Sequence, residues 1–289
     1  MIRRLTVSLH DGGEIAMQAD GPEEAAAFDG LGKLLRLPVG EGSPSAGDAE
    51  FVSPDALPAD RHTVRDLPLT EIAYDAAWRR TLIAGWKRPP RHPAHYRTVL
   101  WRKLLIYAAM NASLRGADAS LVHCAALETG RGAALLFGES GMGKSTAFGR
   151  WRAAGGKGFS DDMALLDFSG KDGIYVRRMP TWSACEAGRN EWDYPAGEEL
   201  PLAAVFALGR SRTGRDEIVE VSPAQFFAQC YRSVFYWSLV RAKDLPRVLQ
   251  ERLAAQVRRR TDRLAEKFPP RALLTVRDGN PVELIEESL

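Results

Sequence analysis

The feature that most restricts the fold of this chain is a glycine-rich motif at residues 138–146, which reads Gly-Glu-Ser-Gly-Met-Gly-Lys-Ser-Thr. It fits the pattern G-x-x-x-x-G-K-[ST], which requires a strand before the loop and a helix after it. The sequence meets this requirement, because the apolar residues 133–137 precede the motif and a helical segment follows it. The motif therefore predicts an α/β protein with a phosphate-binding loop.

Each part of this motif has a physical role in holding phosphate groups. Glycines let backbone N–H groups curl around phosphate oxygens, and the helix that begins near Lys144 adds the positive end of its dipole. Lys144 can reach the β- and γ-phosphates, and Ser145 can bind Mg²⁺. We therefore expect ATP and Mg²⁺ as cofactors, with nucleotide-binding residues Gly138, Glu139, Ser140, Gly141, Met142, Gly143, Lys144, Ser145 and Thr146.

Two adjacent aspartates, Asp161 and Asp162, follow the motif and precede a strand-like apolar run. One carboxylate of such a pair can hold a metal ion directly or through water, while its neighbour accepts the proton of an attacking hydroxyl. The alternative is a surface turn, because Ser-Asp-Asp is also common turn chemistry. Beside a phosphate loop, we favour the catalytic interpretation.

Two short apolar segments before the motif, residues 121–127 and 133–137, predict a β-hairpin joined by a glycine-containing turn. If Glu128 faces Ala133, His123 faces the first glycine of the motif. An imidazole there could hydrogen-bond the phosphates or orient an aspartate, whereas a lone strand histidine is more often a satisfied core or edge residue. The predicted register favours the interpretation that His123 belongs to the phosphate-binding site.

The remaining segments predict two regions that meet near residue 95. Residues 2–17 indicate a hairpin, residues 40–69 an irregular connector or a poorly ordered loop, and residues 98–114 a helix that leads into the core. We expect residues 1–95 to form an α+β region that binds a substrate or partner, and residues 96–289 to form the core with C-terminal helices.

Helices are also predicted from about residue 223 through an aromatic cluster and over residues 245–267, before a strand at 272–276. We interpret the aromatic cluster as core, with a substrate platform as the alternative. A cluster of basic residues near the C-terminus is interpreted as the solvated face of a helix, with contact to phosphate or an acidic partner as the alternative: Arg258, Arg259, Arg260, Arg263, Lys267 and Arg271.

Composition removes several classes of function. A net charge of +2 gives no general attraction to nucleic acid or membrane, and the longest apolar stretches fall far short of the roughly 20 residues of a membrane span. Three widely separated cysteines lack metal-ligand spacing and predict neither a disulfide framework nor a zinc site. We expect a cytoplasmic protein without membrane contact.

The histidine, the loop and the aspartate pair together resemble the HPr kinase/phosphorylase family, over residues 121–168. That family has a histidine on the strand before the loop, a G-x-S-G-x-G-K-S loop and an Asp-Asp pair after the next helix. Here these elements are Val122-His123, residues 138–145 and Ser160-Asp161-Asp162. The resemblance implies an α/β P-loop core like that of HPr kinase and phosphoenolpyruvate carboxykinase, with a small N-terminal α+β segment.

The same resemblance implies roles for individual residues. Lys144 would contact the phosphates, Asp162 would accept the proton of a substrate hydroxyl, and His123 would be an active-site histidine. Ser145 and Asp161 would hold Mg²⁺. Glu186 lies near the family's second metal-binding glutamate, with a plain surface carboxylate as the alternative.

The family's second glycine-rich signature is missing, and residues 175–193 stand in its place. Arg177 and Arg178 in this segment could bind a transferred phosphate or an acidic substrate, but adjacent strand residues face opposite ways, so at most one should reach the site. The segment looks more like HPr-kinase-like proteins found with peptide-modification clusters, including lasso-peptide kinases.

This likeness implies an enzyme that transfers the γ-phosphoryl group of ATP to a serine of a peptide or small protein, such as a ribosomally made peptide. HPr-kinase relatives are often hexameric, so a homo-oligomer is also implied. The alternative is an ATP-binding regulatory or assembly module with slow hydrolysis and no acceptor. A nucleic-acid ATPase would rest on the C-terminal basic cluster alone, so nucleic acid is not an expected partner.

Overall fold

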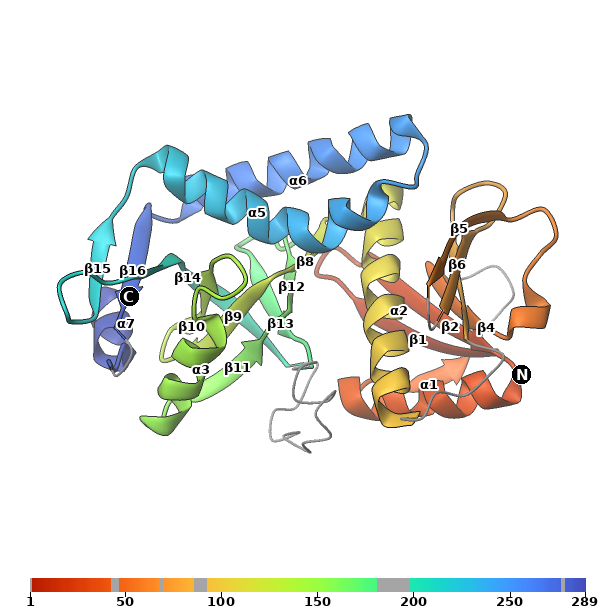
Figure 1. The fold of residues 1–289 in the computed structure, drawn as a ribbon, viewed down its shortest axis with the longest axis horizontal. Helices are drawn as coiled ribbons and strands as arrows, with labels where there is room; N and C mark the ends of the chain where they lie inside the picture. The colour runs from red at the N-terminus through yellow and green to blue at the C-terminus, as the bar shows by residue number, and fades with distance from the viewer. Residues whose placement is uncertain (1, 43–46, 68–69, 86–92, 181–197, 277–278) are drawn as a thin grey trace.

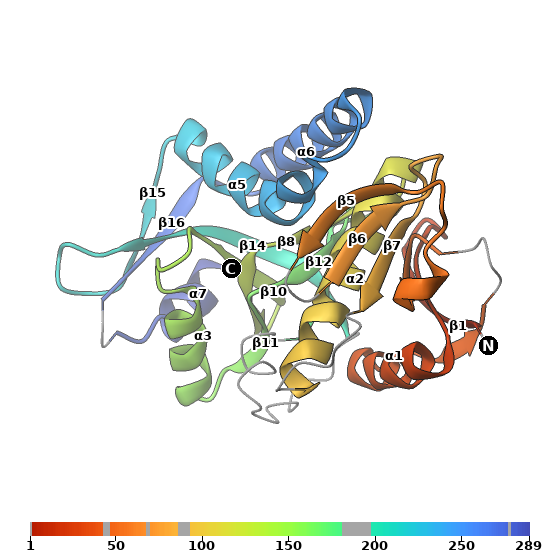
Figure 2. The same ribbon diagram turned by 45° about the vertical axis from the view of Figure 1, so that its right-hand side comes forward.

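The computed structural model describes residues 2–42, 47–67, 70–85, 93–180, 198–276 and 279–289. These residues form two mixed β-sheets flanked by helices, which confirms the α/β class expected from the sequence. Helix α2 (Pro93–Arg115) lies between the two sheets (Figure 1, Figure 2). Helices α5 (Pro223–Ala242) and α6 (Arg247–Lys267) extend across the second sheet towards α2 (Figure 1). No helix in the described ranges is both long and apolar enough to cross a membrane.

The N-terminal sheet has seven strands in the order β3-β1-β2-β4-β7-β6-β5. Its first two strands form the hairpin predicted for residues 2–17, with Leu5 opposite Met17. Helix α1 (Pro22–Leu35) packs against this hairpin through buried Phe28 and Leu31. The strands are β1 (Ile2–Ser8), β2 (Glu14–Asp20), β3 (Val39–Glu41), β4 (Ala49–Val52), β5 (His62–Leu67), β6 (Thr70–Tyr74) and β7 (Thr81–Gly85).

The expectation of an irregular connector over residues 40–69 is wrong for much of that segment. It contains β4, β5, most of β3 and a short 3-10 helix, η1 (Pro54–Ala56). Strand β4 is central in the sheet, pairs in parallel with both β2 and β7, and has all four residues buried. Strand β4 is only four residues long and includes a buried glutamate, Glu50, so its sequence gives no clear strand pattern when turn-forming residues surround it.

Helix α2 confirms the helix predicted over residues 98–114 and joins the two halves of the molecule. One hydrophobic cluster contains Met17 of the N-terminal sheet, Leu104 of α2, Leu165 of the second sheet and Trp237 of α5. The apolar core is therefore continuous across residue 95, so the two regions pack directly on each other.

The second sheet has nine strands, seven of them in the order β11-β9-β10-β14-β13-β12-β8, and β16 joins β15 to β14. On β10, Leu135 and Phe137 face the helices α5 and α6, while Leu136 faces α3 (Lys144–Ala153) and α7 (Val282–Ser288). Helices thus cover both faces of this part of the sheet. The strands are β8 (Ala119–Val122), β9 (Cys124–Thr129), β10 (Gly132–Phe137), β11 (Lys157–Asp161), β12 (Ala164–Asp167), β13 (Tyr175–Arg178), β14 (Glu199–Arg210), β15 (Glu217–Glu220) and β16 (Arg271–Thr275).

The predicted strand over residues 121–127 is interrupted at His123, and this break shapes the site. Strand β8 pairs with β12 before the break, and β9 pairs with β11 and β10 after it. The strands that pair with β9 and β8 are interrupted at the same level, between Asp161 of β11 and Ala164 of β12. The predicted register is confirmed, since Glu128 lies opposite Ala133 and Cys124 opposite Phe137.

Helices α5 and α6 confirm the two helices predicted in the C-terminal part. The Ser222 side chain and Gln225 form the predicted capping box at the start of α5. The aromatic cluster of α5 is only partly core, because Phe226 and Trp237 are buried but Tyr236 keeps 40% of its surface exposed. Tyr236 lies on the side of α5 that faces the glycine-rich loop region, stacked on His123.

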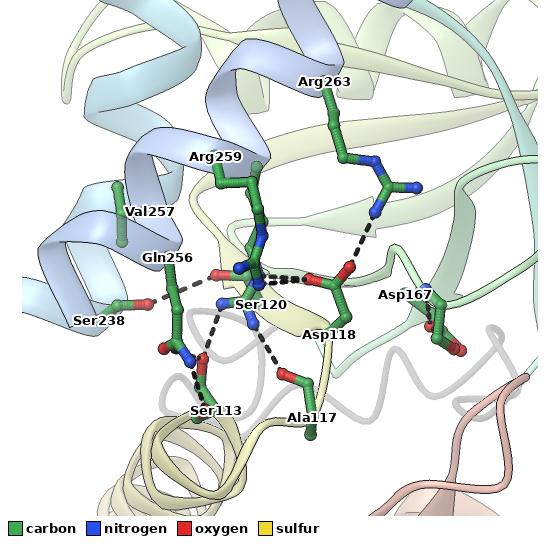
Figure 3. A network of polar contacts seen from close by, with 12 residues as sticks. Ser113, Ala117, Asp118, Ser120, Asp167, Ser238, Gln256, Val257, Arg259 and Arg263 are labelled. Atoms are coloured by element: carbon green, nitrogen blue, oxygen red, sulfur yellow. Dashed lines mark hydrogen bonds and ion pairs between the residues drawn. The ribbon is translucent and has the colours of Figure 1, made fainter. Parts of the chain in front are cut away.

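The basic group on α6 is not simply a solvated face, because Arg260 is only 1% exposed. Its Nε donates to Asp118 Oδ1 at 3.1 Å, and its other nitrogens donate to Ser113 Oγ and Ala117 O at 2.7 Å. Figure 3 shows Arg259 and Arg263 directed at the same Asp118 carboxylate. A helix sequence cannot show that an acidic side chain 142 residues earlier neutralises one of its arginines.

Candidate functional site

The motif at residues 138–146 forms the predicted strand–loop–helix unit. Strand β10 ends at Phe137, and α3 begins at Lys144 with Gly143 as its N-cap. Gly141 and Gly143 have φ angles of 81° and 99°, which side chains rarely adopt, so glycine is required at both positions. The loop is therefore built to expose its backbone beside the start of a helix.

Lys144 lies inside this loop with only 7% of its surface exposed. Its Nζ donates to Gly138 O at 2.8 Å and to Glu139 O at 3.1 Å. Burial lowers the pKa of the Lys144 ammonium, and the nearby Asp161 and Asp162 carboxylates oppose that shift. The predicted phosphate-binding lysine and the predicted aspartate pair are thus brought together by the fold.

Asp161, the last residue of β11, faces the start of α3. The Ser145 hydroxyl donates a hydrogen bond to its carboxylate, and burial raises the pKa of Asp161 while Ser145 and Lys144 lower it. Its Oδ1 atom is buried and has no hydrogen-bond partner among the described residues. A buried carboxylate oxygen beside a serine hydroxyl is a donor set that suits Mg²⁺, which prefers hard oxygen ligands. Asp161 and Ser145 could therefore hold the expected metal ion.

Asp162 occupies the break between β11 and β12 in a strained backbone conformation. Its φ angle is 107°, outside the region that residues with side chains normally adopt, and its N–H donates to Cys124 O at 3.0 Å. Its side chain remains 26% exposed, unlike the buried Asp161. The adjacent carboxylates are thereby directed into two environments, one buried and one partly exposed to solvent.

His123 lies at the matching break between β8 and β9, with 13% of its side chain exposed. Its Nε2 atom is 3.7 Å from Asp162 Oδ1, and its ring stacks on Tyr236 with centroids 4.5 Å apart. Burial lowers the pKa of His123 to about 4, and the Lys144 charge adds to that effect. The imidazole is therefore neutral at physiological pH.

Sequence reasoning missed the part of α5 that lies over this site. Arg232 forms an ion pair with Glu139 of the loop, and the Ser233 carbonyl accepts a hydrogen bond from the His123 N–H at 3.0 Å. Tyr236 follows one turn later, stacked on His123. Residues four apart share a helix face, but no sequence signal connects that face to a loop 93 residues away.

A cleft of about 560 Å³ lies beside the glycine-rich loop. The loop, α3 and the ends of β14 and β16 line it, with Thr146, Arg150 and Arg210 among its polar side chains. The size and the two arginines suit a phosphorylated ligand of nucleotide size.

Within its described ranges, the structure does not place any of three other predicted site residues beside the glycine-rich loop. Glu186 lies outside the described residues. Arg177 and Arg178 face opposite ways as predicted: Arg177 pairs with Glu199 at 2.8 Å, while buried Arg178 lies over the Phe159 ring. Their described contacts hold strands of the sheet together and give neither arginine a place beside the loop.

The fold and the site define a mixed α/β protein in which a glycine-rich loop between a strand and a helix adjoins an aspartate pair. The chain belongs to the family described as SynChlorMet cassette protein ScmC, whose model matches residues 96–289. That description states no activity.

The solved structure of the HPr(Ser) kinase/phosphatase from Coxiella burnetii shows a distant resemblance to this chain. The identity is 14% and the TM-score 0.26, over 36% of this chain and 71% of that chain. No curated protein matches the chain.

Proposed function

We propose that this protein is an ATP-dependent kinase with an HPr-kinase-like P-loop core, which transfers the γ-phosphoryl group to a serine hydroxyl of a peptide or small protein. The observation that carries the proposal is the division of labour between Asp161 and Asp162. Asp161 is buried beside Ser145 and Lys144, and Asp162 is partly exposed beside neutral His123. Phosphoryl transfer needs one group for the metal and one for the acceptor proton.

In this mechanism the loop backbone and Lys144 would bind the triphosphate, and Ser145 and Asp161 would hold Mg²⁺, which would neutralise phosphate charge when bound. Asp162 accepts the proton of the acceptor hydroxyl. The hydroxyl oxygen forms a bond to the γ-phosphorus as the bond to the β–γ bridging oxygen breaks, and ADP leaves. Because its imidazole is neutral, His123 places no positive charge beside Asp162 that would weaken this carboxylate as a base, and its ring lies against both Asp162 and Tyr236 of α5.

Residues 1–95 are proposed to recognise the acceptor, because every proposed catalytic group among the described residues belongs to the core of residues 96–289. The turn after β1 contacts that core directly, where the His10 N–H donates to Asp167 at 2.9 Å. A peptide bound to the N-terminal sheet would therefore be held by a region packed on the catalytic core. A reaction that uses ATP is consistent with a cytoplasmic protein.

The test is incubation of the purified protein with Mg²⁺ and γ-labelled ATP, together with HPr, serine-containing peptides or free serine. We expect label in a peptide or protein acceptor from the wild type and none from Asp162→Asn, which should still bind ATP. Asp172→Asn is the matched control, because Asp172 is an exposed aspartate on the turn between β12 and β13. Tight ATP binding without transfer to any acceptor would favour the regulatory module instead.

A further inference from the structure

The ion pair between Arg232 and Glu139 places a second cation at the glycine-rich loop. Arg232 Nη1 donates to Glu139 Oε1, and both side chains are 59% exposed. Glu139 directly follows Gly138, and the carbonyl oxygens of both residues accept hydrogen bonds from Lys144 Nζ. The guanidinium group is therefore tethered beside the part of the loop where the lysine would meet the outer phosphates of a nucleotide.

The backbone that carries Arg232 is fixed at this place. The next residue, Ser233, accepts the His123 N–H through its carbonyl, and Tyr236 stacks on the His123 ring. Helix α5 is thus attached to the site on the side of Asp162. Because the helix is anchored while the arginine side chain is long and exposed, the guanidinium group can move without any shift of the helix.

The present partner of Arg232 is a weak one. An exposed ion pair between two long side chains gains little, because water screens the charges and ordering the side chains costs entropy. A phosphate carries more charge than a carboxylate and can accept two parallel hydrogen bonds from a guanidinium group. An uncompensated Glu139 carboxylate would also repel an incoming triphosphate.

We propose that Arg232 leaves Glu139 to bind the terminal phosphate of a nucleoside triphosphate in the loop, and so distinguishes triphosphate from diphosphate. This inference rests on the proposed binding of a nucleotide by the loop, but not on the identity of the phosphoryl acceptor. It assigns to α5 a binding residue that lies outside the glycine-rich motif. In a kinase, this contact would favour capture of ATP and release of ADP.

The experiment compares the dissociation constants of a non-hydrolysable ATP analogue and of ADP, each with Mg²⁺, by calorimetry. For Arg232→Ala we expect the affinity for the triphosphate to fall about tenfold and the affinity for ADP to change less than about twofold. Arg247→Ala is the matched control, since it removes an equally charged exposed arginine that pairs with Glu251 on α6. It should leave both affinities unchanged.

A double-mutant cycle separates phosphate binding from simple neutralisation of Glu139. If Arg232 binds the phosphate, Arg232→Ala also costs about tenfold in triphosphate affinity in a Glu139→Gln background. If Arg232 only neutralises Glu139, the arginine substitution has no effect in that background, and the inference is overturned. Equal losses for triphosphate and diphosphate would also overturn it.

The same titrations distinguish failure of this inference from failure of the proposed function. If the wild type and the Arg232→Ala variant bind the triphosphate with equal affinity, only the proposed role of Arg232 is contradicted. If the wild type binds no nucleotide at all, both the proposed function and the role of Arg232 are contradicted.

Discussion

The His123 Nε2 atom lies 3.7 Å from Asp162 Oδ1, at the level where two neighbouring strands of the second sheet are both interrupted. Without these interruptions, β8 would continue into β9, and β11 into β12, as one regular ladder. The break moves two polar side chains out of the alternating pattern of a strand. It also leaves Asp162 with a φ angle of 107°. Strained backbone of this kind often marks a functional position.

The strain at Asp162 can be tested with two variants that both remove the carboxylate. Glycine adopts a φ angle of 107° without steric cost, whereas alanine does not. We expect Asp162→Gly to have a free energy of unfolding about 1 kcal/mol higher than that of Asp162→Ala. Urea denaturation of the two proteins measures this difference. Equal stability, or greater stability of the alanine variant, would show that the backbone at this position is unstrained.

The low pKa of His123 predicts how stability depends on pH. Its pKa of about 4 in the folded protein lies below the ordinary value of 6.5, so the unfolded chain binds a proton first as the pH falls. The contribution of His123 to stability is therefore lost between about pH 6.5 and pH 4. A His123→Asn variant lacks this loss, so its unfolding free energy should fall less over the same interval.

Nuclear magnetic resonance of the imidazole gives an independent check on this value. We expect the His123 ring in the folded protein to remain neutral until the pH approaches about 4. Titration near the ordinary value would mean that solvent reaches the ring more freely than its stacking against Tyr236 allows.

The proposed metal ligands predict a change in the metal dependence of nucleotide binding. Wild-type protein should bind ADP more tightly with Mg²⁺ than with EDTA, because Asp161 and Ser145 share the ion with the phosphates. Asp161→Asn and Ser145→Ala should each reduce this difference by about tenfold. Calorimetric titration with and without Mg²⁺ measures it. The same metal dependence in wild type and both variants would place the ion elsewhere.

The network around Asp118 predicts a large loss of stability for one arginine of α6 and a small loss for its neighbour. Arg260→Met removes the buried partner of Asp118 and the donor to Ser113, and should lower the unfolding free energy by about 3 kcal/mol. Arg259 is the matched control, because it is 58% exposed and lies 3.6 Å from the same carboxylate. Arg259→Met should cost less than about 1 kcal/mol. Similar losses for both variants in urea denaturation would contradict a special role for Arg260.

The sequence by itself determined the strand–loop–helix unit around Lys144, the hairpin register that leads to His123, and the helices α2, α5 and α6. These features depend on local patterns, such as the positions of glycines, the alternation of apolar and polar residues, and helix-capping residues. Such patterns can be read without knowing any tertiary contact. The resemblance in turn indicated which residues would meet, and the structure brings His123, Lys144, Asp161 and Asp162 together.

Only the tertiary structure decided the rest. The break at His123, the different environments of Asp161 and Asp162, the burial of Arg260 and the position of Arg232 over the loop all depend on contacts between residues far apart in the chain. A local pattern shows which face of a helix or strand is apolar, but not which distant charge or ring lies opposite it. For this reason the loop could be recognised from its residues, whereas the helix that covers it could not be connected to it before the chain was folded.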